Sequence, residues 1–480
     1  MNQCTNEPKR KTENELPSEL NHNPPYEVQA GDFSREFVEH ISKTQDEPHW
    51  MRYRRLAAYD VYDRLPIPKT PNEDTWKRTT DMHVQDYWRR TDLRPFKLHR
   101  YHPISLSPSE SAEHAPLPDA LANRLASLNG EPGQIVQQDG IVRNVALAED
   151  LERKGVYFAD MNTALKERPE LVEPHFMTKA VPVDWNKFDA LHGAFWQGGY
   201  LLHIPRGVVL EVPLRVFVAL SEAGRTDLSH TLIIADEGSQ VTVLEEHLSG
   251  DTDTPGLHCG AVEIFVADNA HVNYVGVQRW NLRTWNFSTQ RAIIGRDAQL
   301  RWVSSALGSR VSKLNQLSVL EKPGGHSEML GLTFTHARQH LDIHTYQDHQ
   351  APHTTSDLLY RTVLKDRSRS VWAGMIHVHP GGQHTDAYQK NDNLMLSDHA
   401  RADPLPGLEI LASEGIRCTH GATAGPIDKD QVFYLMSRGL SHDAAERLIV
   451  DGFFEPVMQR ISLESVRTQL QQSIDHKLAM

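Results

Sequence analysis

Two side chains that bind soft metals stand two residues apart near the carboxyl end of the chain. They are Cys418 and His420, within the run Cys418-Thr419-His420-Gly421. In an extended strand, residues i and i+2 project from the same face, so this thiolate and this imidazole could reach one shared centre. Tetrahedral zinc sites and iron–sulfur clusters usually take four protein ligands. The pair therefore predicts either an incomplete metal site or a plain buried cysteine beside a histidine bonded to backbone.

Other histidines and cysteines are open to several interpretations. The segment His326–His399 is rich in histidine but follows no ligand spacing. One arrangement to consider is a 2-His-1-carboxylate site, for instance His377 and His379 with Asp386. Cys259, in the apolar run LHCGAVEIF, is expected to be ordinary core.

The chain has no signature of nucleotide binding or nucleophilic catalysis. It lacks the P-loop GxxxxGK[ST], the dinucleotide GxGxxG and the nucleophile elbow GxSxG. Gly381-Gly382 reads as a tight turn between strands. These absences favour a protein that is not an enzyme.

Composition limits the cellular setting and the partners. The chain has 480 residues and a net charge of -13, so nonspecific nucleic-acid binding is not expected. No apolar run reaches 18 residues, and the polar N-terminus does not read as a signal peptide, so no membrane association is expected. Only three cysteines occur, Cys4, Cys259 and Cys418. An odd number at unrelated spacings excludes a disulfide framework and favours the cytoplasm.

Four regions that could position these residues follow one another along the chain. Residues 1–31 are polar and predict a disordered tail. Residues 32–190 predict a helical and mixed region, with two helices over 34–64 separated at Pro48 and further helical stretches at 116–128 and 145–154.

The region 191–425 predicts a β-solenoid. Short alternating strands recur here after small turn residues that are 31, 32, 28 and 27 positions apart: Gly207, Gly238, Ala270, Ala298 and Gly325. A period of about 30 residues with strands and no helices is typical of stacked coils. An ordinary β-sandwich is the alternative.

The last region, 426–480, predicts a helical unit. Asp428 and Gln431 mark the start of a first helix ending at Gly439. Ser441 opens a second helix ending near Gly452, and a third covers about 454–477. Its apolar stripe predicts that the unit covers the end of the solenoid or docks a partner.

The segment 371–440 resembles the C-terminal core of the SufB/SufD family of iron–sulfur cluster assembly proteins. Three motifs match in order: G-x-Q-x-T-D-A-Y-Q-x-N-x-N-L at 381–394, A-x-A-x-P-x-P-x-L-E-I at 400–410 and C-x-H-G-A-T at 418–423. SufB-type proteins carry C-E-H-E-A at this last position, whereas SufD-type proteins carry C-[ST]-H-G-A-[TS]. With Thr419 and Gly421 in place of both glutamates, the chain is most similar to SufD.

This resemblance implies a right-handed parallel β-helix with helical N- and C-terminal parts. It implies a non-catalytic scaffold subunit that pairs with a SufB-like subunit through the β-helix and docks a SufC-like ABC ATPase on its C-terminal helices. A homodimer is possible when the chain is alone. A transient iron–sulfur cluster would form at the SufB–SufD interface, with His420 as a ligand and Cys418 beside it. The chain itself would bind no nucleotide.

Two alternatives differ from this hypothesis. The chain could be SufB-like and carry the cluster itself, which the scarcity of cysteines and Gly421 disfavour. It could also be a β-helical carbohydrate-active enzyme, a class that usually carries an export signal.

Overall fold

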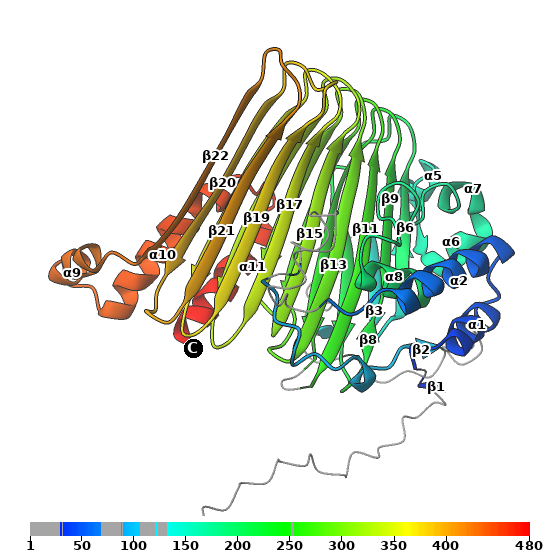
Figure 1. Cartoon of the computed structure of the whole chain (residues 1–480), viewed down its shortest axis with the longest axis horizontal. Coiled ribbons are helices and arrows are strands. Elements are labelled where there is room, and N and C mark those ends of the chain that lie inside the picture. The colour runs from blue at the N-terminus through cyan, green and yellow to red at the C-terminus, as the bar shows by residue number, and fades with distance from the viewer. Residues whose placement is uncertain are drawn as a thin grey trace, which may run out of the picture.

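The computed structural model describes residues 29–30, 32–68, 88, 90–105, 117, 121–122, 132–250 and 254–480. The predicted tail over 1–31 and the predicted helix over 116–128 lie mostly outside these residues. Figure 1 shows an elongated body of stacked strands, with helices gathered at its N-terminal end and along one side toward the C-terminus.

Two long sheets form the body, and the chain alternates between them. The first sheet has the strand order β4 (Ile141–Leu147), β3 (Gly133–Gln138), β7 (Leu214–Leu220), β10 (Gln240–Ser249), β12 (His271–Arg279), β14 (Gln299–Ala306), β16 (His326–Thr335), β18 (Thr355–Leu364), β20 (Asp386–Met395) and β22 (Arg417–Pro426).

The second sheet lies opposite the first. Its order is β5 (Tyr157–Asp160), β6 (Gly199–Ile204), β9 (His230–Ala235), β11 (Gly256–Val266), β13 (Thr284–Ile294), β15 (Val311–Leu320), β17 (His340–His349), β19 (Arg369–Val378) and β21 (Arg401–Ile410), with β8 (Thr226–Asp227) beside β11. A small antiparallel pair, β1 (Gln29–Ala30) and β2 (Ile104–Ser105), stands apart from both.

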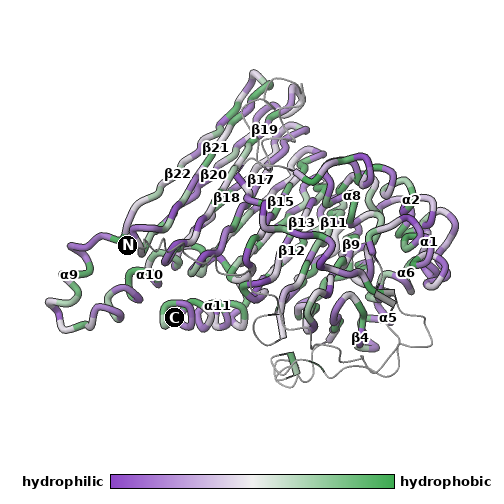
Figure 2. The backbone as a smooth tube through the Cα atoms, turned by 60° about the horizontal axis from the view of Figure 1, so that its bottom comes forward, coloured by the Kyte–Doolittle hydropathy of each residue, from purple (hydrophilic) through white to green (hydrophobic). Residues whose placement is uncertain are grey.

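Each coil contributes one strand to each sheet, and equivalent residues of successive coils pair in parallel. Trp302 of β14 pairs with Met329 of β16, which pairs with Leu358 of β18, and all three side chains are buried between the sheets. Such columns remove apolar surface from water along the whole axis. The predicted parallel β-solenoid is confirmed, with about eight turns. Figure 2 shows hydrophobic and hydrophilic residues interleaved along its strands.

One turn of each coil is built on a residue with positive φ. A left-handed residue reverses the chain tightly, and glycine, asparagine and aspartate adopt this conformation most readily. Its backbone N–H donates to a carbonyl of the next coil, as Gly207 does to Glu237 and Gly238 to Asp268. In these turns the left-handed residues, with φ between 52 and 75°, are Gly207, Gly238, Asn269, Asp297, Gly324, His353, His384 and Gly415. The predicted turn positions Ala270, Ala298 and Gly325 are each wrong by one residue, because the left-handed residue precedes them.

The helices of the N-terminal part pack on the first coils. They are α1 (Arg35–Thr44), α2 (His49–Arg64), the 3-10 turn η2 (Leu98–Arg100), α5 (Glu149–Arg153), α6 (Met161–Glu167), α7 (Pro169–Val172) and α8 (Lys187–Phe195). The predicted break at Pro48 between two helices is confirmed. Arg55 of α2 is fully buried, pairs with Glu47 and donates to the carbonyls of Ala194 and Trp196, so α2 is locked onto α8.

The predicted helix over 145–154 is only partly right. Residues up to Leu147 belong to β4, which pairs antiparallel with β3, and the helix α5 begins at Glu149. The β-branched residues Ile141, Val142 and Val145 suit a strand, and pairing with the neighbouring β3 decides between the two conformations.

Three helices follow the last strand: α9 (Lys429–Ser437), α10 (His442–Met458) and α11 (Glu464–Ala479). Asp428 caps α9 as predicted, accepting from the backbone N–H groups of Asp430 and Gln431. The predicted end of the second helix near Gly452 is wrong, because α10 continues through Pro456 to Met458. The chain then breaks and α11 begins at Glu464.

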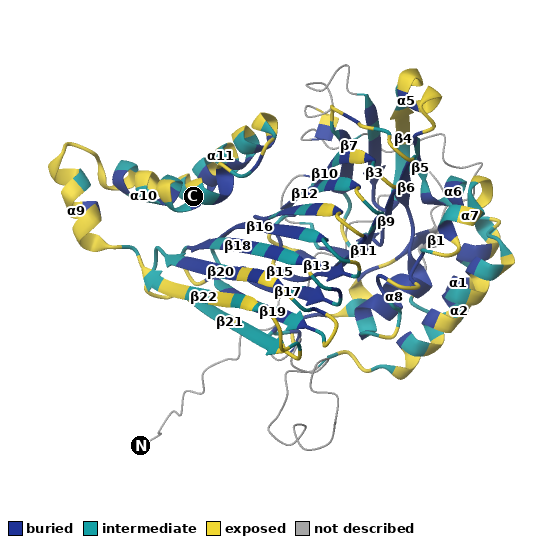
Figure 3. Ribbon diagram, turned by 90° about the horizontal axis from the view of Figure 1, so that it is seen from above, coloured by how far each residue is buried: buried dark blue, intermediate teal, exposed yellow. Residues whose placement is uncertain are grey.

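The reason for the longer α10 is tertiary packing. Its residues Phe454 and Val457, with Leu470 and Ile474 of α11, are buried against the outer face of the first sheet. The helical unit therefore covers the side of the β-helix and leaves its end open (Figure 3). Arg460 fixes this arrangement by ion pairs to Glu328 at 2.5 Å and to Asp357.

Candidate metal-ligand site at the open end of the beta-helix

The predicted pair lies on β22, the last strand of the first sheet. Strand β22 pairs on one side with β20 and forms the sheet edge on the other. In the same way β21 is the edge of the second sheet. Both strands are largely uncovered in Figure 3. The C-terminal end of the β-helix therefore presents two parallel edges, each ten residues long, with backbone groups free to pair with another chain.

Cys418 and His420 face the space between the sheets. They pair with Ala387 and Gln389 of β20, which are 1% and 0% exposed and point inward. Because side chains alternate, the predicted shared face is the inner one, at the mouth of the β-helix. No further coil follows, so His420 is exposed although it points inward.

The two side chains have different surroundings. Cys418 is half-buried and packs against the buried cluster of Ile376, Val378 and Ala387. Burial, together with the negative charge of Asp386, raises the pKa of the Cys418 thiol. A thiol with a raised pKa is mostly protonated at neutral pH, so it becomes a good ligand only when a metal displaces its proton.

Cys259 is not brought near this pair. It lies on β11, five strand positions from β21, which at about 4.8 Å per strand is about 24 Å away. Its thiol is buried under α8 and donates to the carbonyl of Phe188, with Sγ and O 3.3 Å apart. Burial raises the pKa of Cys259 well above its usual value. The burial of Cys259 and its raised pKa both agree with the expectation that it is an ordinary core residue.

The histidine-rich segment divides among several places. His349 is buried between the sheets on Thr354 and Ser356, while the rings of His353 and His384 stack 4.9 Å apart in the turns. His377 and His379 do come together, but with Asp348. The expected partner Asp386 lies on the other sheet, where it pairs with Arg417.

A buried polar network in the first coils was not predicted. His192 Nδ1 lies 2.9 Å from the carbonyl oxygen of Cys259, which can only accept, so Nδ1 carries the proton and Nε2 is an acceptor. His230 Nδ1 must then donate to His192 Nε2, 3.0 Å away. His230 Nε2 in turn meets Glu263 Oε2 at 3.0 Å, so a neutral His230 requires a protonated Glu263.

The pKa shifts agree with this proton order. Burial lowers the pKa of His230 to about 3 and raises that of Glu263 to about 8. The sequence signal that could have revealed the network is Glu263, the one ionisable side chain among the apolar residues of the run GAVEIFV at 260–266. The network joins α8 to the second sheet and lies far from β22, so its role is to satisfy buried polar groups.

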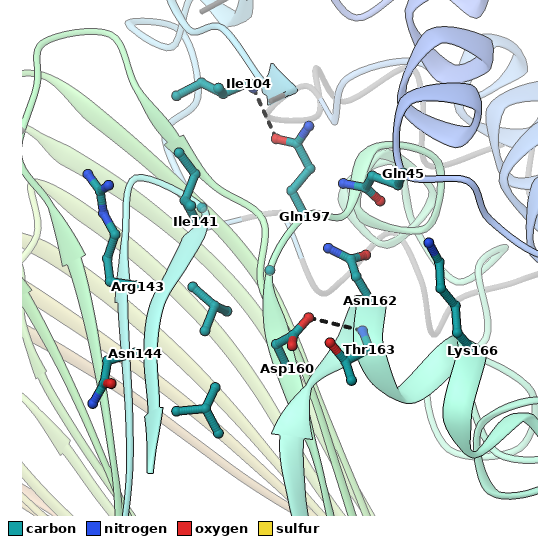
Figure 4. Close-up of a pocket in the computed structure, with 14 residues that line it drawn as sticks. Gln45, Ile104, Ile141, Arg143, Asn144, Asp160, Asn162, Thr163, Lys166 and Gln197 are labelled. Carbon is teal, nitrogen blue, oxygen red and sulfur yellow. Dashed lines mark hydrogen bonds between the residues drawn. The ribbon is translucent and has the colours of Figure 1, made fainter. Parts of the chain in front are cut away.

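A hollow of about 430 Å³ lies in the N-terminal part, between α6 and β4 (Figure 4). Asp160 at its floor accepts from the backbone N–H of Thr163, and Gln197 Oε1 accepts from that of Ile104. None of the residues predicted to bind metal lines it. It is separate from the site on β22.

Helix α9 carries a second surface of interest. It projects away from the β-helix in Figure 1. Five large apolar side chains on and near it are exposed, among them Phe433 at 72%, and together they form what we term the α9 surface: Phe433, Tyr434, Met436, Leu440 and Leu448. Exposed apolar side chains gathered on one element mark a site of interaction.

A membrane-spanning helix would need length and apolarity together. No helix within the described ranges combines the two to the degree required.

Comparison with known proteins points in one direction. Residues 134–216 match the family model of the SufBD protein N-terminal region, and residues 217–453 match that of the SUF system FeS cluster assembly, SufBD core domain. An iron–sulfur cluster assembly SufBD family protein of Staphylococcus haemolyticus is 29% identical over 435 residues, covering 89% of each chain. The iron–sulfur cluster assembly protein SufB of Bacillus subtilis is 27% identical over 434 residues, covering 90% of each.

Proposed function

Because the chain belongs to the SufB/SufD family of iron–sulfur cluster assembly proteins, we propose that it is a SufD-like scaffold subunit. In this proposal it is not an enzyme. It pairs with a SufB-like subunit through the open end of the β-helix, and it lends His420, with Cys418 beside it, to a cluster that forms at the interface.

The observation that carries this proposal is the position of His420. The imidazole is exposed on an edge strand and directed into the mouth of the β-helix. A partner coil stacked on β21 and β22 would bring its own inward side chains over His420 and Cys418. The partner's side chains would then complete the ligand set, and this chain would supply no further ligand.

The Cys418–His420 pair suits an iron–sulfur cluster that is bound only transiently and then transferred. A cluster held by four thiolates is bound tightly, whereas one imidazole and one thiol that must first lose its proton contribute a weaker hold. Thr419 and Gly421 add no carboxylate ligand, and a Cβ at Gly421 would meet no atom within 4 Å. The partner is therefore expected to supply most of the ligands.

The proposal has a second part, which concerns docking of an ATPase on the α9 surface. It is apolar, exposed and carried by helices anchored along the side of the β-helix. We assign it to a SufC-like ATPase. Nucleotide binding by the ATPase would change the contact with α9 and, through α10, bias the interface at the open end.

The direct test uses His420→Ala in the complex co-expressed with SufB-like and SufC-like partners. Assembly should persist, because the side chain is exposed, while the absorbance of a reconstituted cluster under anaerobic conditions should fall by about ten-fold or more. Thr419→Ala, one residue away on the outer face, is the matched control and should retain the cluster. Normal cluster formation in His420→Ala would refute the ligand role.

A second candidate, a SufB-like scaffold, has support in the 27% identity to the Bacillus subtilis SufB protein. Reconstitution of the native chain without the SufB-like partner separates the two. A SufB-like chain would assemble a cluster without a SufB-like partner, whereas a SufD-like chain would not.

A further inference from the structure

The outer face of the second sheet brings together two imidazoles and a carboxylate. Asp348 lies near the end of β17, and His377 on the neighbouring β19 pairs with it directly in the parallel register. His379 follows two residues later and points from the same face. One nitrogen of each imidazole and one carboxylate oxygen lie within 4.8 Å of one another.

Both imidazoles approach the same carboxylate oxygen. His377 Nδ1 and His379 Nε2 lie 3.0 and 2.8 Å from Asp348 Oδ1, which are hydrogen-bond distances. With metal–ligand bonds of about 2.1 Å, adjacent ligands are about 3.0 Å apart in an octahedral site and about 3.4 Å apart in a tetrahedral one. The two nitrogen–oxygen separations are therefore closer to the octahedral spacing than to the tetrahedral one.

The surroundings hold the carboxylate and leave one imidazole open to solvent. Asp348 is mostly buried, and its second oxygen accepts from Gln350 Nε2 at 2.7 Å, which orients the group. The side chain of His379 is 36% exposed, so water has access to the remaining coordination positions. The register also places Glu409 of the edge strand β21 beside His377.

We propose that Asp348, His377 and His379 bind one divalent first-row transition-metal ion in a 2-His-1-carboxylate arrangement. Imidazole and carboxylate ligands with open positions suit six-coordinate ions such as Fe²⁺ and Co²⁺. This site is distinct from His420. The neighbours of His377 on β19, Ile376 and Val378, point inward and belong to the cluster on which Cys418 packs. His377 therefore lies on the outer face of the second sheet, whereas Cys418 and His420 of the first sheet face the space between the sheets.

The test is anaerobic titration of the tag-free full chain with Co²⁺, followed by equilibrium dialysis with Fe²⁺. The chain should bind one ion that shows the weak visible bands of six-coordinate Co²⁺. His379→Ala, which alters an exposed side chain, should weaken this binding by about ten-fold or more, and Asp348→Asn should do the same. The thermal midpoint should rise with Co²⁺ for the native chain and stay unchanged for both variants.

One control makes the result specific. His384→Asn removes another exposed histidine at a left-handed position that asparagine tolerates, and it should leave binding unchanged. If His384→Asn loses the ion, or if His379→Ala and Asp348→Asn both retain it, the proposal is wrong. If the native chain retains no ion, the cluster is only two imidazoles hydrogen-bonded to one carboxylate, and the proposal is wrong.

Discussion

Two cysteines in one chain show how strongly position decides the properties of a thiol. Cys259 and Cys418 both lie on strands of the β-helix, yet the first is enclosed beneath α8 and the second stands in the last coil. Burial raises the pKa of both thiols, and it does so further for Cys259. The thiolate is the reactive form, so the smaller rise in pKa and the greater exposure both favour reaction at Cys418.

We predict that iodoacetamide alkylates Cys418 at least about ten-fold faster than Cys259 in the native chain. Peptide mapping by mass spectrometry measures the two rates, and in urea they should become equal because both environments are lost. A SufB-like partner covering the open end should slow the reaction of Cys418 and leave that of Cys259 unchanged. Equal native rates would contradict the burial of Cys259.

At the scale of elements, the apolar residues of the C-terminal helices serve two different purposes. Some pack on the first sheet, and others are exposed on the α9 surface. Helices α10 and α11 place one apolar face on the first sheet, where Phe454 is 1% exposed. On the α9 surface the side chains are exposed instead, and Phe433 stands in solvent. The first set stabilises the fold, and we assign the second to a partner.

Phe433→Ala with Tyr434→Ala should therefore change the free energy of unfolding by no more than about 0.5 kcal/mol, as for other exposed positions. The same double variant should lose co-purification with the SufC-like ATPase. Phe454→Ala is the contrasting variant and should cost about 3 to 5 kcal/mol in urea unfolding. Retention of the ATPase by the double variant would show that α9 is not its docking element.

At the scale of the whole molecule, the β-helix is closed at one end and open at the other. Helices cover the first coils, whereas β21 and β22 end the sheets as edges. Along β22, the backbone N–H groups of Arg417 and Ile427 bond to β20. In a parallel ladder these donors alternate, so the N–H of Ala422 points to the free edge and that of Thr423 points to β20.

Ala422→Pro should consequently leave the chain folded and weaken its association with a SufB-like subunit by about ten-fold or more, because it removes a donor needed only by an added strand. Analytical ultracentrifugation of the mixed subunits gives the association constant. Thr423→Pro removes a donor used within the sheet and should lower the thermal midpoint instead. If Ala422→Pro associates normally, the interface does not use this edge.

The features that the sequence determined by itself are those set by neighbouring residues or by a pattern that repeats in each coil. The spacing of turn residues indicated the solenoid because each coil repeats the same short-range pattern, and an error of one residue in Ala270 or Ala298 did not change that conclusion. Strand alternation placed Cys418 and His420 on one face. Pro48 and Asp428 marked helix boundaries through the chemistry of their own backbone and side chain.

Tertiary structure decided whatever depends on residues distant in the sequence. The length of α10 follows from packing on the first sheet, which overrides Gly452 and Pro456. The carboxylate beside His377 and His379 is Asp348, one coil earlier, although Asp386 is closer along the chain. The exposure of His420 depends on β22 being the last strand. Stacking of coils joins residues about 30 positions apart, and no local pattern specifies which coil lies at the open end.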